Sequence, residues 1–202
     1  MSLIGQAERV TQNRVVALFR DELGYRYLGN WNDRDNGNIE ESLLGPWLTA
    51  RGHTPAQISM ALHRLRTEAG HHERSLYGNN KAVYELLRYG VPVKTEAGQV
   101  TELVHLMDWQ RPENNDFAVA EEVTLKGGHE RRPDVVLYVN GIAIGVLELK
   151  NSRVSLSDGI RQNLSNQRPE FNAGFFSTVQ FVFAGNDSCL LYTSDAADER
   201  SS

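Results

Sequence analysis

The sequence predicts an α/β fold, with a helical N-terminal half followed by a mixed β-sheet. Two changes in pattern carry this prediction. Apolar residues recur at the helical spacing of about 3.6 residues as far as residue 89, whereas from residue 100 they alternate with polar residues, as in strands. Towards the C-terminus a strand, a helix and another strand follow one another. The same order of elements is also compatible with an α+β arrangement.

The composition is that of a globular domain. A chain of 202 residues is long enough for one core, and 40% hydrophobic and 23% charged residues are ordinary values. The sequence contains no apolar run of about 18 residues, so no membrane span is expected, and no secretory signal is recognisable. A single cysteine fits a reducing cytoplasm. The net charge of −5 does not favour nucleic-acid binding, so local positive patches or other subunits would have to attract DNA.

The first half is expected to contain four helices and one long loop. The loop is the polar segment rich in Gly and Asn at residues 27–38. Asn38 is expected to cap the second helix, with Glu41 completing a pattern like a capping box. Thr54 and Pro55 open the third helix, with Pro at its first position. The four helices are expected at residues 4–23, 39–48, 55–65 and about 76–89.

The second half is expected to supply the strands. Alternating segments predict strands at residues 100–109 and 116–125, and residues 131–152 form an apolar hairpin. A helix at residues 156–167 and a last strand at residues 177–185 complete the pattern. These elements predict a mixed sheet flanked by helices.

The domain is expected to cover residues 1–188, with a helical part at about 1–92 and a sheet-rich core at about 93–188. Residues 189–202 differ from everything before them. This tail resembles the translation of a sequencing-library adapter, so we expect it to be non-native and the chain to be a piece of a longer protein.

The open end of the hairpin carries charged side chains. Asp134 stands at its start, and Glu148 and Lys150 stand two apart at its end, so the last two leave the same face of their strand. Whether Asp134 shares that face depends on the turn.

The turn is Asn140-Gly141, a strong hairpin signal. A two-residue loop pairs Val139 with Ile142 and turns Asp134 away from the other two charged side chains. A three-residue loop, with a left-handed Gly, pairs Tyr138 with Ile142 and brings Asp134 onto their face. We predict the second geometry or an equivalent bulge.

Two neighbouring carboxylates and an ammonium group are suited to phosphodiester hydrolysis. The carboxylates repel each other unless a cation joins them, and oxygen ligands favour Mg²⁺. A lysine beside the ion can orient the attacking water and offset charge in the transition state. The Glu-x-Lys tripeptide alone is equally compatible with a solvated strand end, where Lys150 pairs loosely with Glu148 or Asp134.

At this point the sequence resembles the N-terminal nuclease domain of the restriction (R) subunit of type I restriction enzymes, which belongs to the PD-(D/E)xK superfamily. The resemblance covers about residues 7–188. Besides RRPDVVLYVNGIAIGVLELKNS, it rests on the segments TQNRVVALFRDELGYRYLGNW, NNKAVYELLRYGVPVK, DWQRPENNDFAVAEEVTLKGG, GIRQNLSNQ and FFSTVQFVFAGNDS.

The resemblance implies roles for particular residues. Asp134 and Glu148 would bind Mg²⁺, the backbone carbonyl of Leu149 would be an additional ligand, and Lys150 would be the third catalytic residue. Gln162 matches the Gln of a Gln-x-x-x-Tyr element, although the sequence has Asn, not Tyr, four positions later. Glu8 would be a metal ligand from the first helix, and Arg131, Arg153 and Arg161 would contact DNA phosphates. For each of these side chains an ordinary role at the protein surface is an equal alternative.

The resemblance also implies partners and a setting. The parent protein would cut unmodified double-stranded DNA in the cytoplasm of a bacterium or archaeon, with a methylation (M) and a specificity (S) subunit and without a membrane. Its ATP-driven motor would follow this domain, since no phosphate-binding Gly-x-x-x-x-Gly-Lys-Ser/Thr loop occurs here. We expect the fragment to be inactive alone. The alternative is a non-catalytic assembly domain that docks the motor subunit onto its partners.

Overall fold

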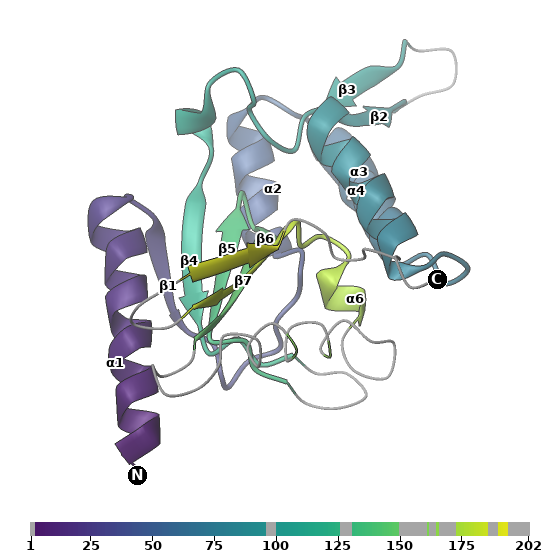
Figure 1. Ribbon diagram of the computed structural model, residues 1–202. Coiled ribbons are helices and arrows are strands. Elements are labelled where there is room, and N and C mark those ends of the chain that lie inside the picture. The colour runs from purple at the N-terminus through teal and green to yellow at the C-terminus, as the bar shows by residue number, and fades with distance from the viewer. Residues whose placement is uncertain are drawn as a thin grey trace.

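A six-stranded β-sheet forms the centre of the described chain, with helices packed on both of its faces (Figure 1). The computed structural model describes residues 3–95, 100–125, 131–149, 161, 165, 173–185 and 190–193. The strands of the sheet, in spatial order, are β1 (Arg26–Asn30), β4 (Phe117–Glu121), β5 (Val135–Val139), β6 (Ile142–Leu149), β7 (Phe181–Gly185) and β8 (Leu190–Thr193).

The sheet is mixed. β4, β5 and β6 are antiparallel neighbours, whereas β1 runs parallel to β4 and β7 runs parallel to β6. The strand β8 is antiparallel to β7. A mixed sheet with helices confirms the predicted α/β class.

Helices and short elements make up the rest of the described chain. The helix α1 continues into a π-helical turn, η1, and a separate two-stranded sheet, β2–β3, follows α4. Their bounds are α1 (Leu3–Ala17), η1 (Leu18–Glu22), α2 (Glu41–Ala50), α3 (Pro55–Ala69), α4 (Leu76–Tyr89), β2 (Val91–Val93), β3 (Glu102–Val104), the 3-10 turn η2 (Pro112–Asn114) and α6 (Ala173–Phe176).

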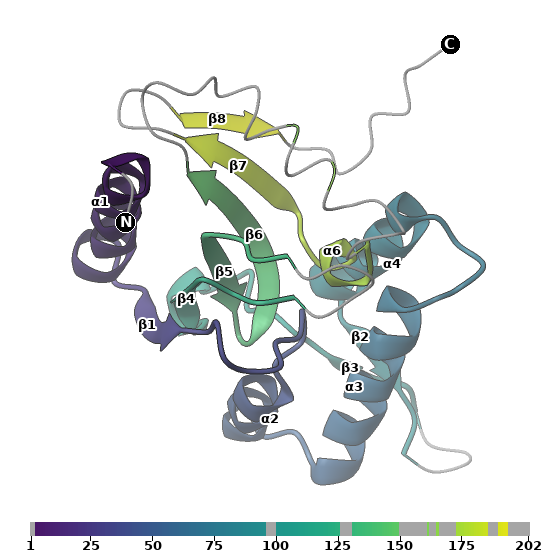
Figure 2. The ribbon, with the colours of Figure 1, turned by 90° about the horizontal axis from the view of Figure 1, so that it is seen from below.

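Three apolar clusters hold these layers together. On one face of the sheet, Val16 of α1 packs with Val135 and Leu147. On the other face, Phe176 of α6 packs with Val146. Figure 2 shows α1 and α6 on opposite sides of the sheet. The third cluster joins α2, α3 and α4 to the two-stranded sheet. The two faces of the central sheet are therefore distinguishable by their apolar neighbours.

Several predicted helices are confirmed. The helix α3 begins at Pro55, and Thr54 and Gln57 form a complete capping box. The helix α4 covers the predicted range and ends at Gly90, which adopts φ +88°. None of the helices within the described residues is long and apolar enough to cross a lipid bilayer.

Other local predictions are wrong. Asn38 does not cap α2: the cap residue is Glu40, and the Asn38 amide donates to the Gly174 carbonyl and the Ser177 hydroxyl, each at 3.0 Å. Residues 26–30, which overlap the expected loop, form β1, because they pair in parallel with β4. The expected strand at 100–109 is reduced to β3, which belongs to the small sheet and not to the central one.

The C-terminal predictions are only partly covered. Within the expected helix at 156–167, Arg161 and Ser165 are helical, and the other residues lie outside the described ones. The last predicted strand begins later than expected, at Phe181. The non-native origin of residues 189–202 stays a prediction; four of these residues form β8, beside β7.

Candidate functional site

The candidate site lies at the open end of the β5–β6 hairpin, opposite its turn. Asp134 immediately precedes β5, and Glu148 is the second-last residue of β6. Because Val135 pairs with Leu147, Asp134 and Glu148 are the next two residues in register. Residues opposite each other on antiparallel strands point to the same face, with Cβ atoms about 4.5–5.5 Å apart. The hairpin thus directs both carboxylates to one face of the sheet.

A bulge produces this register, and the predicted three-residue loop is wrong. The turn has two residues, Asn140 and Gly141, with φ of 53° and 84°, and Val139 pairs with Ile142. Further along β6, Ile144 is inserted opposite no partner and shifts the register by one residue. The bulge, which was the alternative way to reach the same face, is therefore the geometry found.

The Asp134 carboxylate is held against the end of β6. Its Oδ2 accepts a hydrogen bond from the backbone N–H of Leu149 at 2.6 Å. In an extended strand the N–H and C=O of one residue point to the same side, so the Leu149 carbonyl is directed towards the Asp134 side of β6 as well. A carboxylate and a backbone carbonyl thus converge at this edge.

Glu148 is deeply buried, at 1% exposure. Its neighbours Leu147 and Leu149 belong to the apolar cluster on the α1 side, and Val146 belongs to the cluster on the α6 side. Since side chains alternate along a strand, Glu148 lies on the α6 side, opposite Ala184 of β7. This strand end is not solvated, because the Glu148 side chain is almost inaccessible to water. Burying a carboxylate costs free energy unless hydrogen-bond donors or a cation stabilise it.

A second polar group beside the site was missed in the sequence. Gln12 of α1 is 4% exposed, and its Nε2 donates to Glu121 Oε2 at 3.1 Å and to the Asp134 backbone oxygen at 3.3 Å. Glu121, the last residue of β4, also accepts a hydrogen bond from the Tyr27 hydroxyl at 2.6 Å. Gln12 therefore connects α1 to the first residue of the candidate site. One sequence signal could have pointed to this polar group: the otherwise apolar strand β4 ends in a charged residue, Glu121.

Arginines surround the same end of the sheet. Glu122 forms ion pairs with Arg9 at 3.3 Å and with Arg132 at 2.7 Å. Both arginine side chains are about half exposed, so these pairs contribute little stability, on the order of 0–1 kcal/mol each. Their main effect is to bring positive charge close to a cluster of carboxylates.

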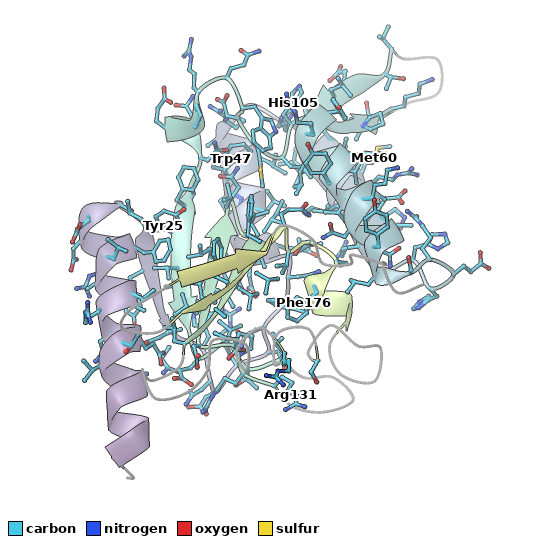
Figure 3. All side chains as sticks on the ribbon, viewed as in Figure 1. Tyr25, Trp47, Met60, His105, Arg131 and Phe176 are labelled. Atoms are coloured by element: carbon cyan, nitrogen blue, oxygen red, sulfur yellow. The ribbon has the colours of Figure 1, made fainter. Side chains whose placement is uncertain are left out.

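The remaining predicted site residues are only partly described. Arg131 is partly buried, and its backbone exchanges hydrogen bonds with Leu125; Figure 3 places it at the lower end of the sheet, near the start of the hairpin. Arg161 is exposed and helical. Four predicted features lie outside the described residues: Lys150, Arg153, Gln162 and the side chain of Glu8, whose backbone belongs to α1.

The donor set fits a hard divalent ion. Within the described residues, no group of three or more His, Cys, Asp or Glu side chains is placed to hold a metal. Two carboxylates with a backbone carbonyl are nevertheless a suitable set for Mg²⁺, which uses one or two carboxylates and completes its shell with waters and substrate phosphates. Asp134, Glu148 and the Leu149 carbonyl could hold such an ion.

Comparison with known proteins identifies the family of this chain. A family model described as "Type I restriction enzyme R protein N terminus" matches residues 5–201. The match covers almost the entire chain and includes both carboxylates.

Curated relatives bear related names. The HindI type I restriction enzyme endonuclease subunit of Haemophilus influenzae is 40% identical over 76 residues, which are 36% of this chain and 7% of that protein. A Methanocaldococcus jannaschii protein named as the MjaIXP type I restriction enzyme endonuclease subunit is 28% identical over 116 residues, which are 54% of this chain and 10% of that protein. The matched regions thus span about a tenth or less of these relatives.

Proposed function

This chain belongs to the family of type I restriction enzyme R protein N termini, and we propose that it is the domain that cuts unmodified double-stranded DNA, with Mg²⁺ as cofactor. The supporting observation is the shared face of Asp134 and Glu148 at the open end of the hairpin. A buried carboxylate opposite a second one suits a cation-dependent hydrolase better than a structural strand end.

Each residue has a defined task in this proposal. Asp134 and Glu148 bind the ion, with the Leu149 carbonyl as an additional ligand. The ion, when bound, neutralises charge on the scissile phosphate and favours a nucleophilic water. Lys150 orients that water and offsets the charge that develops on the phosphate oxygens. Gln162 supports the DNA backbone or the ion, and Glu8 is a further candidate ligand from α1.

The Asp134 hydrogen bond to Leu149 has a mechanistic consequence. It fixes the carboxylate relative to the end of β6, where Glu148 and the carbonyl are located. A preorganised ligand set does not have to be rearranged when the phosphate arrives, which lowers the free-energy cost of reaching the transition state.

The proposed parent protein is a larger machine. Its ATP-dependent motor would lie outside this chain, and methylation and specificity subunits would select the DNA. Arg131, Arg153 and Arg161 would contact phosphates near the cut. The net charge of −5 is acceptable in such a complex, because other parts of it would hold the DNA.

Isosteric substitutions in the full-length R subunit test the proposal. Asp134→Asn and Glu148→Gln keep the side-chain shapes and remove the charges. We expect plasmid cleavage by the reconstituted complex to fall about 100-fold or more, with ATP hydrolysis unchanged. Asp116→Asn is the matched control: Asp116 pairs with Arg26 at the opposite end of β4, and cleavage should persist.

Retained cleavage in both variants, with normal ATP hydrolysis, would contradict the catalytic assignment. It would favour the alternative of an assembly domain that docks the motor subunit onto the other subunits. A loss of complex formation in Asp134→Asn or Glu148→Gln, measured by size-exclusion chromatography, would point the same way.

A further inference from the structure

A second candidate binding site lies at the opposite end of the sheet. A cavity of about 680 Å³ opens between the ends of α2 and α4 and the segment that contains η2. Figure 3 places Trp47 and His105, which line it, at the upper end of the molecule, whereas Arg131 lies at the lower end. Its volume is within the range of small-molecule sites, roughly 300–1,000 Å³. The cavity is therefore separate from the carboxylate site.

The cavity is positively charged although the chain is acidic. Arg51, Arg88 and Arg111 line it together with one carboxylate, Asp108. Hydrogen bonds from Asn114 and from the Arg111 backbone, together with Arg51, lower the pKa of Asp108 to about 2. Asp108 is thus ionised at neutral pH and engaged with Arg51.

Two of these arginines keep their charge available for a ligand. Within the part of the chain that the structure describes, neither Arg88 nor Arg111 forms an ion pair with a carboxylate. Guanidinium groups bind phosphates through two parallel hydrogen bonds, which makes such a pair a suitable receptor for a phosphate.

The two indole rings that line the cavity are fixed by hydrogen bonds from their N–H groups. The indole N–H of Trp47 donates to the Asn114 carbonyl at 3.1 Å, and that of Trp109 donates to the Leu87 carbonyl at 2.7 Å. Trp109 nevertheless remains 49% exposed. The Arg88 guanidinium lies 5.4 Å from the centroid of the Trp109 ring. A fixed, half-exposed indole beside a cation can stack a planar heterocycle.

Favourable interactions with helix ends explain only some of the arginines that line the cavity. Arg51 follows the last residue of α2, and Arg88 lies in the last turn of α4, where cations interact favourably with the helix dipole. Arg111 follows no helix, and its exposed position before η2 has no such explanation. The half-exposed Trp109 ring also remains unexplained by capping.

We propose that this cavity binds a nucleotide, with Arg88 and Arg111 on the phosphate and the Trp109 ring stacked on the base. The ligand is either a free mononucleotide or an unpaired nucleotide of a nucleic-acid strand, since both present the same phosphate and base. This site goes beyond the cleavage function and does not depend on it.

Binding to the 202-residue chain tests the proposal. The probes are dAMP, followed by quenching of tryptophan fluorescence, and a fluorescein-labelled single-stranded dodecamer of deoxyadenosine, followed by anisotropy. We expect the Arg88→Gln/Arg111→Gln double variant to bind at least about tenfold more weakly, because a charged hydrogen bond to phosphate is lost at each position. The control is Arg20→Gln, which removes an exposed arginine paired with Asp21 on η1 and should not change binding.

The two sources of the ligand give different results. If the labelled strand binds and dAMP displaces it, the cavity holds a nucleotide of a strand; if dAMP alone binds, it holds a free nucleotide. Equal affinity of the double variant and the unsubstituted chain would overturn the proposal. So would displacement by inorganic phosphate as effective as that by dAMP, because the base would then contribute nothing.

Discussion

The two ends of the β5–β6 hairpin differ in how they accommodate polar groups. At the turn, Asn140 is fully buried and saturated with neutral partners. Its backbone N–H donates to the Asp116 carbonyl, and its side-chain oxygen accepts from the Asp116 N–H. Its amide donates to the Leu106 carbonyl and to the Asn115 side chain, each at 2.9 Å. This end is a closed network.

The open end brings together groups of like charge. Asp134 and Glu148 share one face, Glu121 ends the neighbouring strand β4, and Glu122 follows it. Arginines pair with Glu121 and Glu122. Like charges in a partly buried position repel, which is unfavourable for stability alone. At the turn a buried polar side chain is surrounded by neutral partners, whereas at the open end carboxylates stand next to one another, an arrangement that a bound cation would stabilise.

Substitution of Gly141 tests the claim that the turn end is structural, and it should have the largest effect on stability. A Cβ at this position would lie 2.7 Å from the Glu40 oxygen and 2.8 Å from the Leu43 Cβ, at a φ of +84°. We expect Gly141→Ala to lower the free energy of unfolding by about 3 kcal/mol or more, from backbone strain and overpacking together. Urea unfolding followed by circular dichroism measures it.

Gly52→Ala is the control for Gly141. Gly52 has a similar φ of +88°, but nothing lies within 4 Å of the position that a Cβ would take there. Its substitution should cost only about 1 kcal/mol, from the dihedral angle alone. Equal losses in both variants would show that the close contact of the turn with residues 40–44 is unimportant.

Gln12 tests the open end from the helix side. Gln12→Leu removes the donor to the Asp134 backbone and to Glu121, leaving buried acceptors without it, and should cost about 1–3 kcal/mol of stability. If Gln12 positions Asp134, the rate of DNA cleavage by the full-length subunit should also fall about tenfold at saturating DNA, with little change in KM.

Tyr27→Phe is the comparison variant for this measurement. It removes a different donor, the Tyr27 hydroxyl, from the same Glu121 carboxylate and leaves the hydrogen bond from Gln12 to the Asp134 backbone in place. Cleavage should therefore stay close to normal. Equal losses of rate in the two variants would mean that Glu121, and not the placement of Asp134, is the feature that matters.

Elements with strong local signals could be predicted from the sequence. The capping box at Thr54 and the glycine that ends α4 act within a few residues, so α3 and α4 were found near their true bounds. The strand β1 was missed because its segment is polar and contains Gly29. Only its pairing with β4, about 90 residues away, makes it a strand, and that contact leaves no local pattern.

The candidate site shows the same division. The types and spacing of Asp134 and Glu148 identified them as a pair. The predicted site then required a strand register that places both side chains on one face. The sequence did not reveal that Ile144 forms a bulge, because a three-residue loop or a bulge could each meet that requirement. Gln12 could not be found, since the packing of α1 brings it to Asp134 across more than a hundred residues.

The smallest expected effect concerns pH. Burial, together with the hydrogen bond to Glu121, raises the pKa of Tyr27 to about 12, from an ordinary value of 10.0. Between these pH values the unfolded chain releases the Tyr27 proton and the folded chain keeps it. The stabilisation is thus fully present below pH 10 and is lost as the pH rises towards 12.

The difference in unfolding free energy between the unsubstituted chain and Tyr27→Phe should shrink from about pH 8 to about pH 11. Tyr84→Phe, at an exposed position on α4, provides the control, and a constant difference for Tyr27 would contradict the raised pKa of its hydroxyl.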